Sequence, residues 1–187
     1  MKHKLTIIKD AVPLNLLDLF KKWAIACEQW GLNYPINYPI EERFFKMNVI
    51  NNDGMNIEKA TGAGIAHSII SMIHQKCKLF DPEILCCGIG VRDKHTKSNI
   101  HTDHKHDLPE EINVMKILGL LDTDWKEDWG GGFHWDGKDY YAPPGSFMLF
   151  NPRIPHKAGD IHCEKKRFAV DYTVASSTPY VLQSPYN

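Results

Sequence analysis

The sequence has no long apolar run, no regular cysteine framework and no excess of charge of either sign. No apolar stretch approaches the ~20 residues that a transmembrane helix requires, so we expect no membrane association. The five cysteines are odd in number and irregularly spaced, which argues against a disulfide framework. Because the formal net charge is only -1, no global field attracts nucleic acid, and we expect no nucleic-acid partner.

Internal repeats, low-complexity segments and linkers are also missing. The start of the chain contains a short apolar run at residues 5–8 but no recognisable secretory signal. At 187 residues, a single domain covering 1–187 is the natural prediction. We expect a reducing, cytoplasmic setting for it, while the sequence gives no indication of the oligomeric state.

Elements of two kinds are predicted, with the helices concentrated in the first half of the chain. Apolar residues at helical spacing predict one helix over residues 16–30, which ends at Gly31, and a second over 66–80. In the rest of this half, the composition predicts short strands at 5–8 and 44–50. It predicts loops at 32–39 and 51–61, the second of which begins with a turn at 51–54. We expect the two loops to cover a functional site.

The second half is rich in short apolar runs separated by glycine and proline. These runs predict strands at 84–91, 114–121, 146–150 and 168–174, followed by an irregular tail from 176 to 187. Pro144 and Gly145 fit the centre of a type II turn. The pattern predicts an α+β fold: a helical N-terminal half (about 1–81) packed on one face of an antiparallel barrel or jelly-roll core (about 82–175).

The segment His101-Thr102-Asp103 is the strongest candidate for a chemical function. On an extended strand side chains alternate, so His101 and Asp103 point the same way and can bind one metal ion. Two histidines and one carboxylate are the ligand set of non-haem Fe(II) oxygenases. His156 is a good third ligand, because Pro155 restricts the backbone of the preceding loop.

An alternating run begins at Arg167 and places small and polar side chains on one face. Phe168, Val170, Tyr172 and Val174 share the apolar face, and Arg167, Ala169, Asp171 and Thr173 share the other. That second face suits a strand that lines a ligand cavity, with Arg167 in a bidentate pair with a carboxylate. Basic clusters at 92–106 and 153–167 are either a solvated rim or attract an anionic cosubstrate or substrate.

Taken in order, these features resemble the Fe(II)- and 2-oxoglutarate-dependent dioxygenases, most closely the prolyl 4-hydroxylase-like branch. The resemblance covers residues 84–174 and consists of His101-x-Asp103, the glycine-rich segment before Phe133, the Pro-x-Gly turn, His156 and Arg167. It implies a double-stranded β-helix, that is, a jelly roll.

The resemblance also implies roles for individual residues. His101, Asp103 and His156 would be the catalytic Fe(II) ligands, and Arg167 would pair with the distal carboxylate of 2-oxoglutarate. Lys165 and Lys166 are alternatives to Arg167. Many arginine-type members have a hydroxyl residue two positions further on; here that residue is Ala169, so Thr173 on the same face is the candidate. Dioxygen would be a cosubstrate and ascorbate a potential stimulant.

The implied activity is hydroxylation of a substrate with release of succinate and CO2. The presence of Asp103 favours hydroxylation over halogenation. A peptidyl proline is the substrate that the family suggests, and a free amino acid or small anionic metabolite is the alternative. Two interpretations of another class remain: a non-oxidative cupin-like metalloprotein and an iron or 2-oxoglutarate sensor. Production of succinate would distinguish the dioxygenase from both.

Several other residues have a structural and a functional interpretation. Cys86 and Cys87 are interpreted as buried strand residues, and His104 and His106 as weaker metal candidates. The aromatic residues near the glycine-rich segment either cover the sheet or shape a substrate pocket: Trp125, Trp129, Phe133, Trp135, Tyr140 and Tyr141.

Overall fold

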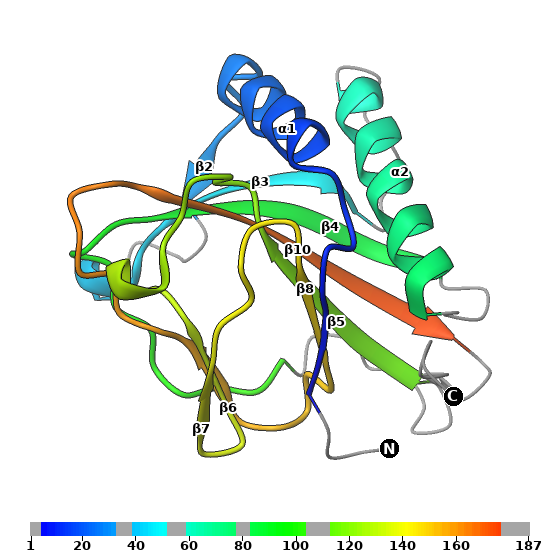
Figure 1. Ribbon diagram of the computed structural model, residues 1–187. Coiled ribbons are helices and arrows are strands. Elements are labelled where there is room, and N and C mark those ends of the chain that lie inside the picture. The colour runs from blue at the N-terminus through cyan, green and yellow to red at the C-terminus, as the bar shows by residue number, and fades with distance from the viewer. Residues whose placement is uncertain (1–4, 33–38, 52–58, 78–82, 104–112, 177–187) are drawn as a thin grey trace.

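The structure is a computed structural model that describes residues 5–32, 39–51, 59–77, 83–103 and 113–176. These residues form two antiparallel sheets and two α-helices, which is the expected α+β class (Figure 1). Helices α1 (Leu14–Ala26) and α2 (Ala60–Cys77) lie on the same face of the larger sheet. Neither helix is long and apolar enough to cross a lipid bilayer.

The larger sheet has seven strands in the order β1-β8-β5-β10-β4-β3-β2. Their bounds are β1 Thr6–Ile8, β2 Gly31–Leu32, β3 Phe45–Ile50, β4 Glu83–Arg92, β5 Asn113–Leu120, β8 Phe147–Phe150 and β10 Arg167–Ser176. Strand β10 lies at the centre, between β4 and β5, and all pairs are antiparallel. Strands from the first fifty residues thus join the same sheet as those of the second half.

The smaller sheet lies on the face of the larger sheet that the helices leave uncovered (Figure 1). It consists of β7 (Lys138–Tyr140), β6 (Phe133–Trp135) and β9 (His156–Ala158), in that order. Strand β8 is buried on both faces, since Phe147 and Leu149 contribute to the core under the helices. Its alternate residues Met148 and Phe150 pack between the two sheets. The two layers therefore follow from the alternation of side chains along one apolar strand.

The first helix ends earlier than the sequence pattern predicts. It stops at Ala26 rather than at Gly31, and Gly31 begins the short strand β2. Trp30 still packs against the core, because the chain folds back and its indole Nε1 donates a 3.1 Å hydrogen bond to the carbonyl of Ala24. The spacing of apolar residues alone could not show that Trp30 reaches the core through a turn rather than as part of the helix.

The second helix begins at Ala60, six residues before the first apolar residue of its predicted pattern. The strands predicted in the second half are confirmed to within one or two residues. Strands β6, β7 and β9 were not predicted, because three residues are too few to show an alternating pattern. The proline–glycine turn is confirmed, with Gly145 at φ 87° and a 2.9 Å hydrogen bond from the Ser146 amide to the Pro143 carbonyl.

Some predictions lie largely or wholly outside the described residues. These are the loop at 32–39, the turn at 51–54, the loop at 51–61, the end of the second helix beyond Cys77 and the C-terminal tail. The expected covering of a site by the two loops stays a prediction.

Candidate metal centre

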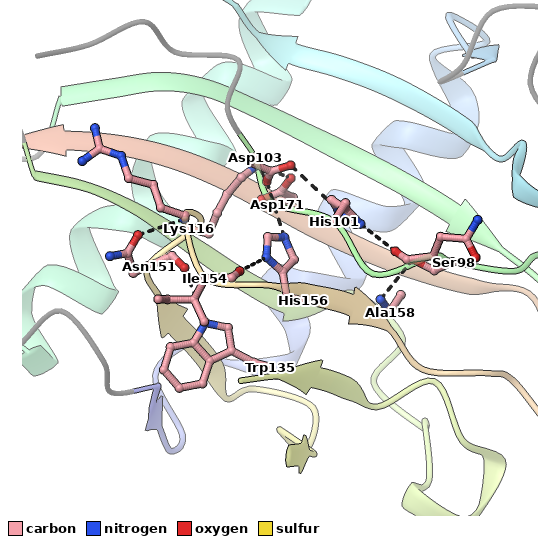
Figure 2. Close-up of polar contacts among 12 residues, drawn as sticks. Ser98, His101, Asp103, Lys116, Trp135, Asn151, Ile154, His156, Ala158 and Asp171 are labelled. Atoms are coloured by element: carbon pink, nitrogen blue, oxygen red, sulfur yellow. Dashed lines mark hydrogen bonds and ion pairs between the residues drawn. The ribbon is translucent and has the colours of Figure 1, made fainter. Parts of the chain in front are cut away.

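Three side chains that the sequence singled out meet in the structure. The donor atoms of His101, Asp103 and His156 lie within 4.8 Å of one another (Figure 2). Nε2 of His101 is 3.8 Å from Oδ1 of Asp103, and Nε2 of His156 is 3.7 Å from Oδ2 of the same carboxylate. Two nitrogens and a carboxylate therefore face a common point.

Backbone hydrogen bonds hold the two ligand segments together. His101 and His156 form an isolated antiparallel bridge, with N–O distances of 3.0 and 2.9 Å. The amide of Asp103 donates to the carbonyl of Pro152 at 2.9 Å. The prediction that His101 and Asp103 lie on a strand was wrong in detail, because among the described residues this segment forms a single bridge and no strand. Their side chains nevertheless point to the same side, as the strand hypothesis required.

Both histidines are oriented through their second ring nitrogen. Nδ1 of His101 lies 2.8 Å from the Asn99 carbonyl, and Nδ1 of His156 lies 2.8 Å from the Ile154 carbonyl. A carbonyl only accepts hydrogen bonds, so each Nδ1 carries the proton. In the neutral ring Nε2 is then unprotonated and directed toward Asp103. Metal-binding histidines show this arrangement, in which the outer hydrogen bond fixes the tautomer.

Aromatic side chains enclose one side of the group. His156 is the first residue of β9 and is only 4% exposed. Its ring lies 5.6 Å from the ring of Phe133 on β6 and 5.2 Å from that of Phe150 on β8, between centroids. His101 and Asp103 are half-buried, so the described residues leave the opposite side of the group partly exposed.

A lysine that the sequence analysis missed lies beside the candidate metal-binding group. Lys116 on β5 is buried, and its Nζ lies 3.4 Å from Oδ2 of Asp103 and 2.8 Å from Oδ2 of Asp171 on β10 (Figure 2). The available signal was a charged residue inside the apolar run of the predicted strand at 114–121. A lysine buried in a strand requires charged partners, and here it has two.

The carboxylate of Asp103 and the ammonium of Lys116 each stabilise the charged form of the other. Burial by itself would raise the pKa of the Asp103 carboxyl, but the charge of the neighbouring Lys116 ammonium helps to lower it well below its usual value. Burial likewise would lower the pKa of the Lys116 ammonium, whereas Asp171 and Asp103 raise it above its usual value. Both side chains are therefore ionised at neutral pH.

Arg167 is the first residue of β10 and is buried, as the cavity hypothesis required. Its Nη1 donates to the carbonyl of Gly131, and its Nε has no partner among the described residues. Burial, with a smaller effect from Arg92, lowers the pKa of the guanidinium to about 10, and Asp122 opposes the change. The group stays cationic at neutral pH, with an unsatisfied donor that an anionic ligand would complete.

A small cavity lies next to this guanidinium, between the two sheets. Its walls are mostly apolar or small apart from Arg167 and come from β5, β6, β8, β10, the glycine-rich segment and the residues after β7: Leu118, Gly119, Leu120, Gly131, Gly132, Phe133, Tyr141, Ala142, Met148, Arg167 and Ala169. Gly131 has φ 70°, and a Cβ there would meet the Arg167 side chain at 3.0 Å. The absence of a side chain at Gly131 therefore leaves room for the Arg167 side chain to pack against this segment.

Thr173 lies on the predicted face of β10 but not in the lining of this cavity. It is fully buried next to Cys86 and Lys116, and its hydroxyl has no partner among the described residues. Ala169 is the residue that lines the cavity with Arg167. The alternatives Lys165 and Lys166 are exposed, and Lys165 pairs with Asp124 at 2.5 Å.

Most of the other described candidates pack within the protein, although Phe133 and Tyr141 also line the cavity beside Arg167. Trp125 and Trp129 pack edge to face at 5.5 Å, and Phe133 and Trp135 lie in the core between the sheets, so most of this aromatic group covers the sheet. Cys87 is buried on β4, as expected, whereas Cys86 is only half-buried. His104 and His106 lie outside the described residues.

Comparison with known proteins identifies the fold. No family model and no curated protein matches the sequence. The structure is similar to a Pseudomonas putida prolyl-4-hydroxylase (14% identity, 93% of this chain and 94% of that chain, TM-score 0.59). It is also similar to a viral collagen prolyl hydroxylase from Paramecium bursaria Chlorella virus-1 (10% identity, 93% of this chain and 97% of that chain, TM-score 0.62). A third similar structure is the carbocyclase SnoK from nogalamycin biosynthesis (13% identity, 94% of this chain and 80% of that chain, TM-score 0.67). The chain therefore has the fold that prolyl 4-hydroxylases share with other 2-oxoglutarate–Fe(II) oxygenases.

Proposed function

We propose that this protein is an Fe(II)- and 2-oxoglutarate-dependent dioxygenase that hydroxylates its substrate. The observation that supports this most directly is the convergence of His101, Asp103 and His156 with both Nε2 atoms free to bind a metal. The two facing sheets are consistent with a jelly roll, and we interpret them as a double-stranded β-helix.

The residues present fit an iron ion. Two imidazoles and one carboxylate suit ferrous iron and leave coordination positions for other ligands. When bound, iron with 2-oxoglutarate and O2 would supply the oxidising chemistry that yields succinate, CO2 and the hydroxylated product. The protein itself would hold the metal through His101, Asp103 and His156. It would also exclude water on the side where Phe133 and Phe150 pack against His156.

The residues also fit 2-oxoglutarate. Arg167 would pair with the distal carboxylate, which satisfies the buried Nε that has no partner among the described residues. Leu118 and Leu120 would contact the methylene carbons, and Ala169 leaves room where a larger side chain would project. Thr173 is too far along the strand to share this cavity in the described structure, so we do not assign it to the cosubstrate.

The substrate that we propose is a proline in a peptide. Its support is the set of prolyl hydroxylases among the similar structures, which includes one from Trichoplax adhaerens in complex with a peptide fragment. A small anionic metabolite is the second candidate. The basic clusters at 92–106 and 153–167 would support this candidate. That support is weakened because Lys94, Lys97 and Lys165 each form an ion pair with an acidic side chain.

The activity is tested by incubating purified protein with Fe(II) and 2-oxoglutarate without oxygen. We expect a weak visible metal-to-ligand charge-transfer band, and succinate after oxygen is admitted. His156→Ala should abolish both. His134→Ala is the matched control, because His134 lies on the neighbouring strand β6 beside Lys157 and is not in the ligand group. Metal-loaded protein with neither band nor succinate would favour the cupin-like or sensor alternatives.

The substrate is tested by the increase in succinate over the rate without substrate. Proline-containing peptides should raise this rate and gain one oxygen by mass spectrometry, whereas free amino acids and small carboxylates should not. Stimulation by free amino acids alone would replace the peptide proposal and leave the dioxygenase proposal intact.

A further inference from the structure

A buried cation contacts the carboxylate of the candidate metal centre, and a second carboxylate holds that cation. Lys116 projects from β5 on the face that bears the metal-binding group, and its side chain is 10% exposed. Its ammonium is closer to Asp171, at 2.8 Å, than to Asp103, at 3.4 Å. The two acidic side chains reach it from different segments, β10 and the loop after β4 (Figure 2).

A positive charge beside a metal ligand is expected to weaken metal binding, so the presence of Lys116 here needs an explanation. A cation near a divalent metal repels it, and a cation paired with a metal ligand competes with the metal for the same oxygen. A fully apolar side chain would avoid both effects. The chain instead has a buried lysine here, together with an aspartate that takes up the shorter of its two contacts.

We propose that Lys116 and Asp171 form a positioning pair for the metal ligand Asp103. Lys116 holds Oδ2 of Asp103, so that the carboxylate binds the metal through one oxygen. Asp171 anchors the ammonium and limits how strongly it competes with the metal. This proposal rests on the proposed function, because it assigns the metal to His101, Asp103 and His156.

The proposal gives opposite effects for the two partners. Without the ammonium, Asp103 donates more electron density to the metal, so the charge-transfer band should move to lower energy. Without the charge of Asp171, the ammonium should turn to Asp103 and reduce that donation, so the band should move to higher energy. Metal affinity should also fall in the second case, by roughly tenfold, which is the scale of changes around metal ligands.

The experiment compares Lys116→Met, Asp171→Asn and the double variant with the unaltered protein. Co(II) affinity is measured by titration without cosubstrate, and the band is recorded anaerobically with Fe(II) and 2-oxoglutarate. We expect Asp171→Asn to weaken Co(II) binding and Lys116→Met not to weaken it. The double variant should behave as Lys116→Met does, because Asp171 acts through Lys116. Lys46→Met is the control, since Lys46 lies in the same sheet on β3, which β4 separates from β10.

Two further controls keep the proposal falsifiable. Lys116→Gln keeps a hydrogen-bond donor without the charge and replaces Lys116→Met if that variant does not fold, as judged by circular dichroism. Equal weakening of Co(II) binding by both single variants, or weakening by Asp171→Asn in the Lys116→Met background, would overturn the proposal. Absence of the band in the unaltered protein would instead overturn the dioxygenase function, while Co(II) affinity would still decide the role of the pair.

Discussion

At the scale of single residues, Arg167 is a buried cation with one donor that no described residue satisfies. Its guanidinium is buried, donates to a backbone carbonyl and keeps an Nε without a partner among the described residues. A buried donor without a partner costs free energy, because it has lost its hydrogen bonds to water. A bound anion would remove this cost by supplying the missing acceptor.

Arg167→Ala should therefore raise the 2-oxoglutarate concentration needed for the charge-transfer band. Charge-assisted hydrogen bonds contribute about 1.5–3 kcal/mol, so we expect a change of roughly 10- to 100-fold. Co(II) affinity should stay nearly the same, because Arg167 does not contact His101, Asp103 or His156 in the described structure. The exposed Lys165→Ala is the control. An unchanged 2-oxoglutarate requirement would mean that another residue pairs with the distal carboxylate.

At the scale of elements, a glycine of α2 packs directly against a tryptophan of α1. Gly62 near the start of α2 is buried, and a Cβ there would meet the Trp23 ring of α1 at 2.1 Å. That ring stacks on Phe20, with centroids 5.7 Å apart, so it cannot move away freely. The helix pair covers the sheet core, and its spacing depends on this position.

Gly62→Ala should destabilise the protein although alanine favours helix. Overpacking of a buried contact costs roughly 1–3 kcal/mol, which exceeds the gain in helix propensity. Gly64→Ala is the matched control on the same helix, because its Cβ would meet nothing within 4 Å. We expect that variant to be more stable by roughly 0.5–1 kcal/mol. Urea unfolding followed by circular dichroism measures both, and equal stability of the two variants would contradict the packing argument.

At the scale of the whole molecule, the candidate metal centre lies between the two sheets. His156 belongs to β9 in the smaller sheet, whereas Asp103 contacts Lys116 of the larger sheet. A metal bound to all three ligands would link these layers in the native state only. Metal binding should therefore stabilise the complete fold by mass action.

Adding Co(II) at 100 times its dissociation constant should stabilise the native state by about 2.7 kcal/mol. For a chain of this length that corresponds to a rise of roughly 5–10 °C in Tm. Differential scanning fluorimetry with and without a chelator measures the effect. His134→Ala should keep the full shift, and His156→Ala should lose it. A shift of equal size in His156→Ala would place the metal elsewhere.

Local patterns predicted much of the candidate site. The spacing of His101 and Asp103 and the alternation that begins at Arg167 concern neighbours in the sequence, whose relative directions the backbone dictates. The same reasoning placed Asp171 on the cavity face but could not find Lys116 as its partner. That pair forms between strands fifty-five residues apart, and nothing local encodes which residues two strands bring together.

The sequence by itself determined the α+β class, the main strands and which residues are candidate metal ligands. These depend on the order and spacing of side chains, which short-range geometry converts into faces and turns. Only the tertiary structure decided how His101 and His156 pair, how Trp30 returns to the core and how Lys116 meets two carboxylates. Those contacts arise when distant segments pack, because their energies depend on burial and distance rather than on position along the chain.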